Sequence, residues 1–259
     1  MSELQMKPGR EEFRAMAADH TVVPVWTELL ADLETPVAAY AKLVGDGTGF
    51  LLESVEHGER WSRFSFVGRD PVATLILRDG TIEVTGEIPA TVPTDQGMLA
   101  ALDGLLREYR APIIADLPPL QSGVMGFLGY DVVREVERLP DVPFDDRSFP
   151  DAIMSVIGSL AAFDHWRQRV YLIESVPVLG FEDDALDDAF DSACARVERA
   201  VADLARPLAY VPVPPPEPGE SVPTVRSSMP NGMYQAAVEV AKEHILARSE
   251  EHTLNSSHQ

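Results

Sequence analysis

Residues 72–85, VATLILRDGTIEVT, decide the fold class. Two apolar runs rich in β-branched residues are joined by Asp79-Gly80, and this dipeptide in such a setting predicts a β-hairpin. A second hairpin is predicted from the runs 152–163 and 169–173, which are joined through residues 164–168. Because hairpins produce antiparallel sheets, the pattern argues against a regular βαβ repeat.

Helices are expected between these strands. Thr35 suits an N-cap and Pro36 suits the first position of a helix that ends near Gly45. Apolar spacing predicts another helix over 98–106, capped by Thr94 or Asp95, a short helix near 131–137 and a long acidic helix over 182–205. Further strands are expected at 49–54, 63–68 and 122–129. The predicted fold class is α+β, with antiparallel, sandwich-like sheets and flanking helices.

Composition limits the function. The 259 residues carry 42 Asp and Glu against 21 Lys and Arg, for a formal charge of −21. This excess repels phosphate backbones and anionic lipid, so neither nucleic acid nor a membrane is an expected partner. The N-terminal residues are polar, and no apolar run reaches the ~20 residues of a membrane span. A single cysteine, Cys194, excludes an internal disulfide and lies on the apolar side of the long helix. The sequence predicts a cytoplasmic protein.

A change in composition predicts domain boundaries. Six of the 13 residues 211–223 are proline, which is typical of an extended linker. A helical pattern resumes over 233–247 and is followed by residues without apolar periodicity. We therefore predict an N-terminal domain over 1–206, a proline-rich linker over 207–226, a first helix of a further domain over 227–247 and a separate tail over 248–259.

Few motifs carry recognisable chemistry. The histidines lack metal-site spacing, and neither a Walker sequence nor G-x-S-x-G is present. Gly123, Gly126 and Gly129 have the wrong spacing for a dinucleotide fingerprint, so they predict bulges or close backbone packing.

The end of the strand at 49–54 is more informative. Glu53 and Ser54 end the apolar run 50–54, and Arg63 supplies a guanidinium from the facing run 61–65. A free amino acid requires an acceptor for its ammonium, a donor for its carboxylate and an apolar slot for its side chain. These three residues could supply the polar part of such a site. The alternative is a strand end with a surface ion pair.

Four blocks of sequence resemble one family. They are LLESVEHGERWSRFSFVGRDP at 51–71, SGVMGFLGYDVVREVERLPDVP at 122–143, FDHWRQRVYLI at 163–173 and SSMPNGMYQAAVEVAKEHILA at 227–247. In this order they resemble the N-terminal part of anthranilate synthase component I. Aminodeoxychorismate synthase component I is a close relative, but the Leu-Leu-Glu-Ser strand followed by Arg-Phe-Ser-Phe-Val-Gly favours the anthranilate branch.

The resemblance implies an activity and an effector. The complete enzyme of this family converts chorismate to anthranilate and pyruvate, with Mg²⁺ and with ammonia from a glutamine amidotransferase, component II. L-Tryptophan inhibits it by binding a pocket built partly on the Leu-Leu-Glu-Ser strand. That implies effector-binding roles for Leu52, Glu53 and Ser54, with Arg63 at a basic position nearby. The rest of the pocket is expected from a C-terminal domain.

The chain also departs from the family. Residues 248–259, RSEEHTLNSSHQ, stand where the family continues into its chorismate-binding core, and they resemble a translated sequencing adapter. The resemblance implies that the family's metal-binding glutamates and acid–base histidine lie downstream. We therefore expect no catalytic residue and no metal ligand in this chain, and no synthase activity from it alone. The alternative is a free-standing, non-catalytic module that binds an amino acid.

Overall fold

The computed structural model divides the chain into two compact units, Met1–Ala209 and Tyr210–Gln259, and each is described by itself. The four-part division expected from the sequence stays a prediction. The structure describes residues 4–53, 63–140, 142, 144–145, 147–208, 212–215, 217, 219, 227 and 229–255, with side chains as far as 247.

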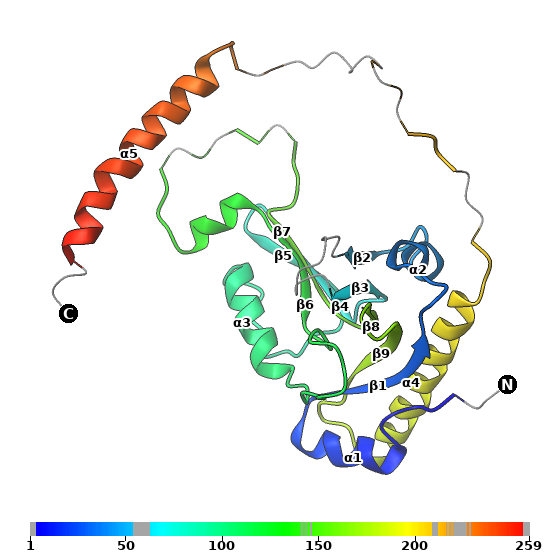
Figure 1. Cartoon of the computed structure of the whole chain (residues 1–259). Helices are drawn as coiled ribbons and strands as arrows, with labels where there is room; N and C mark the ends of the chain where they lie inside the picture. The colour runs from blue at the N-terminus through cyan, green and yellow to red at the C-terminus, as the bar shows by residue number, and fades with distance from the viewer. Residues whose placement is uncertain are drawn as a thin grey trace. The chain divides into compact units, whose positions relative to one another are not determined.

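Five antiparallel strands form the first sheet of the larger unit (Figure 1). The hairpin predicted through residues 164–168 is confirmed, since Asp164 pairs with Arg169. β1 has no counterpart among the predicted strands. In order across the sheet the strands are β1 (Val22–Leu30), β9 (Arg169–Pro177), β8 (Ser159–Asp164), β3 (Phe64–Arg69) and β2 (Gly49–Leu52).

Four antiparallel strands form the second sheet. The hairpin predicted from 72–85 is confirmed, because Arg78 pairs with Thr81 around Asp79 and Gly80. The φ angles of 48° at Asp79 and 72° at Gly80 suit a two-residue hairpin turn of type I′. The α+β class with antiparallel sheets is therefore confirmed. In order the strands are β5 (Thr81–Gly86), β4 (Ala73–Arg78), β7 (Ala152–Val156) and β6 (Val124–Leu128).

Two chain segments connect the first sheet with the second. β3 leads into β4 through residues 70–72, and β7 leads into β8 through Ile157 and Gly158. The antiparallel pair β3–β8 thus continues as the pair β4–β7. The sequence pattern predicts one unbroken strand over 152–163, and this prediction is wrong. The strand ends because the chain changes sheets at Ile157 and Gly158.

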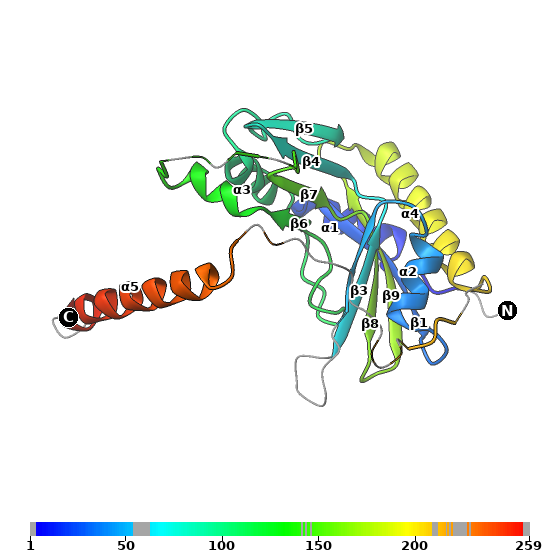
Figure 2. The same ribbon diagram turned by 90° about the horizontal axis from the view of Figure 1, so that it is seen from above.

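Helices α1 (Arg10–Asp19), α2 (Pro36–Leu43) and α4 (Asp183–Leu204) cover one face of the first sheet (Figure 2). Phe13 of α1 and Phe190 of α4 lie 5.4 Å apart between ring centroids. Cys194 is half-buried beside the same cluster. The segment 112–121 covers the opposite face of this sheet, so the sheet is enclosed on both sides.

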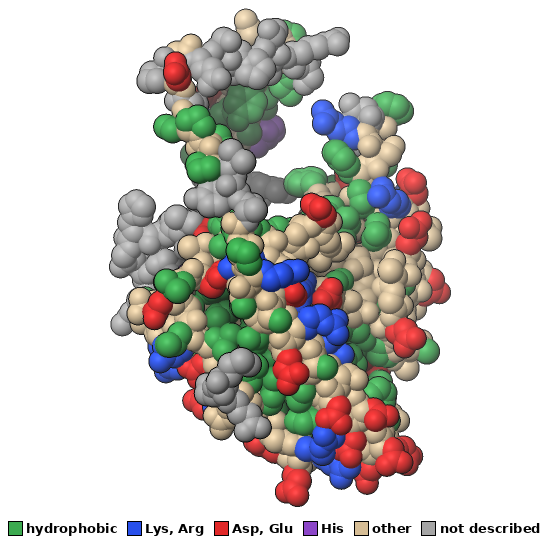
Figure 3. All heavy atoms as spheres, turned by 90° about the vertical axis from the view of Figure 1, so that its right-hand side faces the viewer, with side chains coloured by type: hydrophobic (Ala, Val, Ile, Leu, Met, Phe, Trp, Pro, Cys, Tyr) green, Lys and Arg blue, Asp and Glu red, His purple; other side chains and the backbone are tan. Residues whose placement is uncertain are grey.

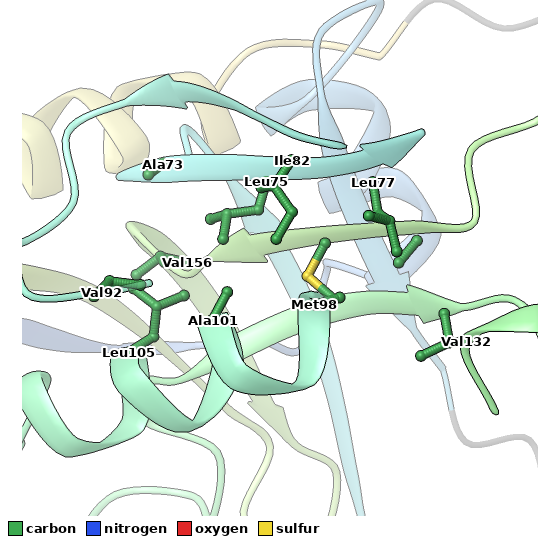
Figure 4. Close-up of a cluster of buried hydrophobic side chains, with 11 residues drawn as sticks. Ala73, Leu75, Leu77, Ile82, Val92, Met98, Ala101, Leu105, Val132 and Val156 are labelled. Carbon is green, nitrogen blue, oxygen red and sulfur yellow. The ribbon is translucent and has the colours of Figure 1, made fainter. Parts of the chain in front are cut away.

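Helix α3 (Met98–Glu108) covers one face of the second sheet (Figure 4). Met98, Ala101 and Leu105 recur at helical spacing and are fully buried against Leu75 and Val156. Full burial of a large apolar side chain stabilises a fold by about 1.5–3 kcal/mol. This cluster therefore attaches α3 firmly to the sheet.

The helix ends test the predicted caps. Thr35 is confirmed as the N-cap of α2, where its hydroxyl accepts a hydrogen bond from the Ala38 N–H at 3.1 Å. The predicted caps of α3, Thr94 and Asp95, are wrong. The carboxylate of Glu135 accepts from the N–H groups of Met98 at 2.7 Å and Leu99 at 2.8 Å. The short helix expected near 131–137 is the 3₁₀ helix η1 (Tyr130–Glu135), which supplies this carboxylate.

The surface of the larger unit mixes both signs of charge. In the view of Figure 3, Asp and Glu side chains are spread among Lys and Arg. Arg14 of α1, for example, donates to both carboxylate oxygens of Asp187 on α4, at 2.9 and 2.5 Å. Both side chains of this pair are partly exposed, so solvent screens their attraction, and the buried apolar face of α4 contributes more to its attachment.

The smaller unit has one helix among its described residues, α5 (Met233–Asn255). Apolar spacing predicts a helix over 233–247, and the structure confirms its start and continues it to Asn255. None of the helices in the described part of the chain is long and apolar enough to cross a membrane.

Candidate ligand-binding site

The residues predicted to bind an effector lie at the end of β2. Leu52, its last residue, pairs with Phe66 on β3 and is 41% exposed. Glu53 follows the strand and is also exposed. Ser54 lies outside the described residues. The described part of the strand end thus presents an apolar side chain and a carboxylate to solvent, and the role of all three residues stays a prediction.

Arg63 lies just before β3 and is already engaged. Its Nε and Nη2 atoms donate to the two carboxylate oxygens of Asp164 at 3.0 and 2.5 Å. The guanidinium carbon also lies 4.6 Å from the ring centroid of Phe64 and 5.1 Å from that of Trp166. This two-point pairing is the strongest geometry available to a guanidinium and a carboxylate. Within the larger unit, Arg63 is therefore held at the end of the β8–β9 hairpin, and its binding to an effector remains a prediction.

Asp164 is the buried member of this pair, with only 2% of its side chain exposed. Burial opposes ionisation of Asp164, but hydrogen bonds from Arg63 and from the N–H groups of Arg167 and Trp166 outweigh it and lower the pKa of the carboxyl. Asp164 therefore remains charged at neutral pH and fixes the position of Arg63. Its importance was not evident from the sequence, although it lies in the FDHW block that carries the resemblance.

An apolar cavity of about 190 Å³ adjoins β2. It lies between the two sheets, since β2 and β3 of the first and β6 and β7 of the second contribute to its wall. Small-molecule sites are commonly apolar clefts of about 300–1,000 Å³, so this one suits a small ligand such as an amino-acid side chain. Its side-chain lining is mainly Phe50, Pro71, Met125, Phe127, Ile153 and Ile157.

Glycines shape this cavity. A Cβ at Gly68 would lie 2.1 Å from the ring of Phe50, so the glycine leaves room for that ring to lie across β3. A Cβ at Gly126 would lie 1.9 Å from the carbonyl oxygen of Ile153, so β6 and β7 approach closely only because this residue has no side chain. The close packing predicted for the glycines at 123–129 is confirmed at Gly126.

Two of the polar side chains at the cavity, Arg69 and Ser155, are hydrogen-bonded within the fold. Arg69 donates to the Leu43 carbonyl at 2.9 Å and to Asp203 at 2.7 Å. The Ser155 and Thr74 hydroxyls are hydrogen-bonded at 2.9 Å. Among the described residues, no group of three or more His, Cys, Asp or Glu side chains could hold a metal ion. The geometry therefore suits a neutral apolar group better than an ion or a reacting centre.

The fold and the cavity define this chain as an α+β protein with a candidate site for a small apolar group beside β2. Comparison with known proteins then identifies its relatives. The anthranilate synthase component 1 of Mycolicibacterium smegmatis is 41% identical over 201 residues, 77% of this chain and 38% of that protein. The proteins of the same name from Mycobacterium tuberculosis H37Rv and Arthrobacter globiformis are 40% and 36% identical, over 80% and 93% of this chain and 41% and 46% of their own lengths.

No family model matches the chain. A solved structure of anthranilate synthase component I from Streptococcus pneumoniae TIGR4 has 23% identity and a TM-score of 0.40 over 66% of this chain and 36% of that one. The chain spans less than half the length of the curated relatives named above. Over the matched residues it is a homologue of anthranilate synthase component 1, which confirms the resemblance found in its sequence.

Proposed function

We propose that this chain is the regulatory part of an anthranilate synthase component 1 and binds L-tryptophan at the end of β2. The observation that carries the proposal is the apolar cavity lined by Phe50 of this strand, with an exposed carboxylate, Glu53, three residues further along the chain. The names of the relatives support the anthranilate branch over the aminodeoxychorismate branch. The protein would act in the cytoplasm, in the first step of tryptophan biosynthesis.

The ligand's ammonium and ring find separate partners in this arrangement. Its ammonium would bind Glu53 and Ser54, and its ring would enter the cavity beside Phe50. Arg63 is paired with Asp164 through Nε and Nη2 and lies five residues before Gly68, roughly 16 Å along β3 from the cavity wall, so the carboxylate would need a closer donor and a role for Arg63 stays a prediction. Leu52 would cover the ligand on its exposed side. The contact with Glu53 would compensate the ammonium for the hydration that it loses on binding.

The activity of the complete enzyme belongs to the same proposal. It would convert chorismate to anthranilate and pyruvate, with ammonia supplied by a glutamine amidotransferase subunit, component II. The residues described here offer no cluster suited to the Mg²⁺ that the family resemblance implies, so we assign no step of the reaction to them. Feedback requires only that tryptophan prefer one of two conformational states, and couplings of about 1–3 kcal/mol are typical.

Calorimetry with the purified chain tests the effector site. L-Tryptophan should bind, whereas L-alanine, which lacks the ring, and indole-3-propionate, which lacks the ammonium, should bind at least tenfold more weakly. Glu53→Gln should reduce the affinity for tryptophan and leave that for indole-3-propionate unchanged. Equal affinity for all three compounds would show that the site is not an amino-acid site, and no binding of tryptophan would show that this chain does not form the site by itself.

A separate assay tests the proposed lack of activity. The purified chain, incubated with chorismate, Mg²⁺ and ammonium, should give no anthranilate fluorescence above a heat-treated control. Anthranilate formation in proportion to the protein concentration would contradict the proposal that catalysis requires further sequence.

A further inference from the structure

One wall of the cavity beside β2 carries a hydroxyl group among apolar side chains. Successive residues of a strand point to opposite faces of its sheet, and Leu75 and Val156 pack against α3 on one face of the second sheet (Figure 4). Ser155 therefore points to the other face. Its partner on β6 is Met125, and both residues line the cavity. The hydroxyl of Ser155 thus belongs to the cavity side of the sheet.

Ser155 lies within the wall of the cavity. It is half-buried, and Ile153 and Ile157, two residues away on either side, also line the cavity. Its strand, β7, pairs with β4 on one side and with β6 on the other, so the backbone N–H and carbonyl groups there lie in the plane of the sheet and serve its ladders. The hydroxyl is the polar group that this part of the wall presents to a ligand.

The other polar side chains at the cavity are less suited to accept a hydrogen bond from a buried group. Among the described residues that line it, these side chains belong to Arg69 and Thr48. A guanidinium has donors only, and that of Arg69 donates to the Leu43 carbonyl and to Asp203. Thr48 precedes β2 and is exposed, so water competes for its hydroxyl. Ser155 is therefore the side chain best placed to accept from a donor inside the cavity.

The Ser155 hydroxyl has capacity for a further hydrogen bond. Its Oγ atom lies 2.9 Å from the Oγ1 atom of Thr74 on β4, and either hydroxyl can be the donor. A hydroxyl has one donor and two acceptor lone pairs. If Ser155 donates to Thr74, both of its lone pairs remain for other donors, and if Thr74 donates, one remains. In either case Ser155 can accept one hydrogen bond from a ligand without losing its bond to Thr74.

We propose that Ser155 determines the specificity of the tryptophan site by accepting a hydrogen bond from the indole N–H; this inference rests on the proposed function. The indole N–H is a donor only, and it usually has a partner when it is buried. In an apolar wall without an acceptor, the N–H would lose its hydration without compensation, which weakens binding. Ser155 removes this cost for tryptophan and gives no such gain to a ring that lacks an N–H group, such as that of phenylalanine.

Calorimetry with the full chain and two ligands tests this role. The ligands are L-tryptophan and 3-benzothienyl-L-alanine, in which a sulfur atom replaces the N–H group and the shape of the ring is kept. Ser155→Ala should weaken tryptophan binding about tenfold and leave the affinity for the benzothienyl compound unchanged. The matched control is Thr74→Val, which removes the other end of the same hydrogen bond, keeps the Ser155 hydroxyl and alters no residue that lines the cavity. It should bind both ligands as the unaltered chain does.

The outcomes separate this inference from the proposed function. If the unaltered chain binds tryptophan and Ser155→Ala binds it as tightly, the indole N–H has another acceptor and the inference is wrong, while the proposed function stands. Equal weakening for both ligands, or the same loss in Thr74→Val, would show that Ser155 acts only through the sheet and would also overturn the inference. If the unaltered chain does not bind tryptophan, the site is not formed by this chain and the role of Ser155 fails with it.

Discussion

Gly158 lies directly against the backbone of Asp70. A Cβ at position 158 would be 2.0 Å from the Asp70 carbonyl oxygen, and Asp70 itself has a φ of 46°. These two residues mark the place where both crossing segments leave one sheet and enter the other. A hydrogen bond from the Val72 N–H to the Val156 carbonyl, at 3.0 Å, joins the two segments, and one from the Ser175 N–H of β9 to the Gly158 carbonyl, at 2.8 Å, holds the second segment to the first sheet.

Gly158→Ala should therefore destabilise the fold. The added methyl group meets backbone, which cannot move aside as a flexible side chain could, so a loss of about 2–3 kcal/mol in the free energy of unfolding is expected. Urea unfolding followed by circular dichroism measures it. Gly9→Ala is the control, because no atom lies within 4 Å of a Cβ there and its φ is −69°. Similar losses in both variants would show that the crossing is not specially constrained.

Glu135 should stabilise α3 from a distance of 37 residues along the chain. Its carboxylate satisfies two N–H groups at the positive end of the helix, so Glu135→Ala should cost about 1–2 kcal/mol. Glu135→Gln should cost less, because the amide keeps one oxygen acceptor. Chemical denaturation of both variants measures the difference. Glu137→Ala, at an exposed position outside this cap, should have little effect, and an equal loss there would argue against the capping role.

The lowered pKa of Asp164 predicts that the stability of the fold depends on pH. Its pKa in the folded state is lowered from the usual 3.8, so the folded state favours the charged form. The stabilisation is fully present above pH ~4 and is lost as the pH falls through the lowered pKa. Asp164→Asn should thus reduce stability at pH 7 by about 2 kcal/mol and flatten its decline below pH 4.

Unfolding free energies measured between pH 7 and pH 2.5 test this dependence. The comparison variant is Asp103→Asn, whose exposed carboxylate pairs with Arg107 on the surface of α3. Its acid profile should match that of the unaltered chain. If Asp164→Asn showed the same decline in acid as the unaltered chain, other groups would control the acid sensitivity.

Local chemistry made part of this fold predictable. The Asp79-Gly80 turn, the Thr35 cap and the apolar side of α3 depend on residues close together in sequence. The α3 cap was predicted wrongly because its carboxylate comes from Glu135, which no local pattern connects to Met98. The break at Gly158 was missed for the same reason, since the backbone it meets belongs to Asp70.

The candidate site was only partly predictable as well. The resemblance predicts binding roles for Leu52 and Glu53, which stay predictions, and it gives no sign that Arg63 pairs with Asp164, 101 residues away. The cavity combines β2 with β6 and β7, and no spacing rule relates Phe50 to Phe127. Gly126 is the one feature of the sequence that indicates this wall of the cavity, because it predicts a close backbone approach at that strand.

Phe127 offers the sharpest test of the cavity as the binding slot for the tryptophan ring. Phe127 lines the cavity and is 47% exposed, while its neighbour Leu128 is 45% exposed and does not line it. Phe127→Ser should weaken tryptophan binding about tenfold, equivalent to about 1.4 kcal/mol, because the ring loses an apolar wall. Leu128→Ser should leave the dissociation constant unchanged. Both substitutions remove a half-exposed apolar side chain from β6. Equal weakening would therefore indicate a general effect on the strand and would show that the indole does not bind in this cavity.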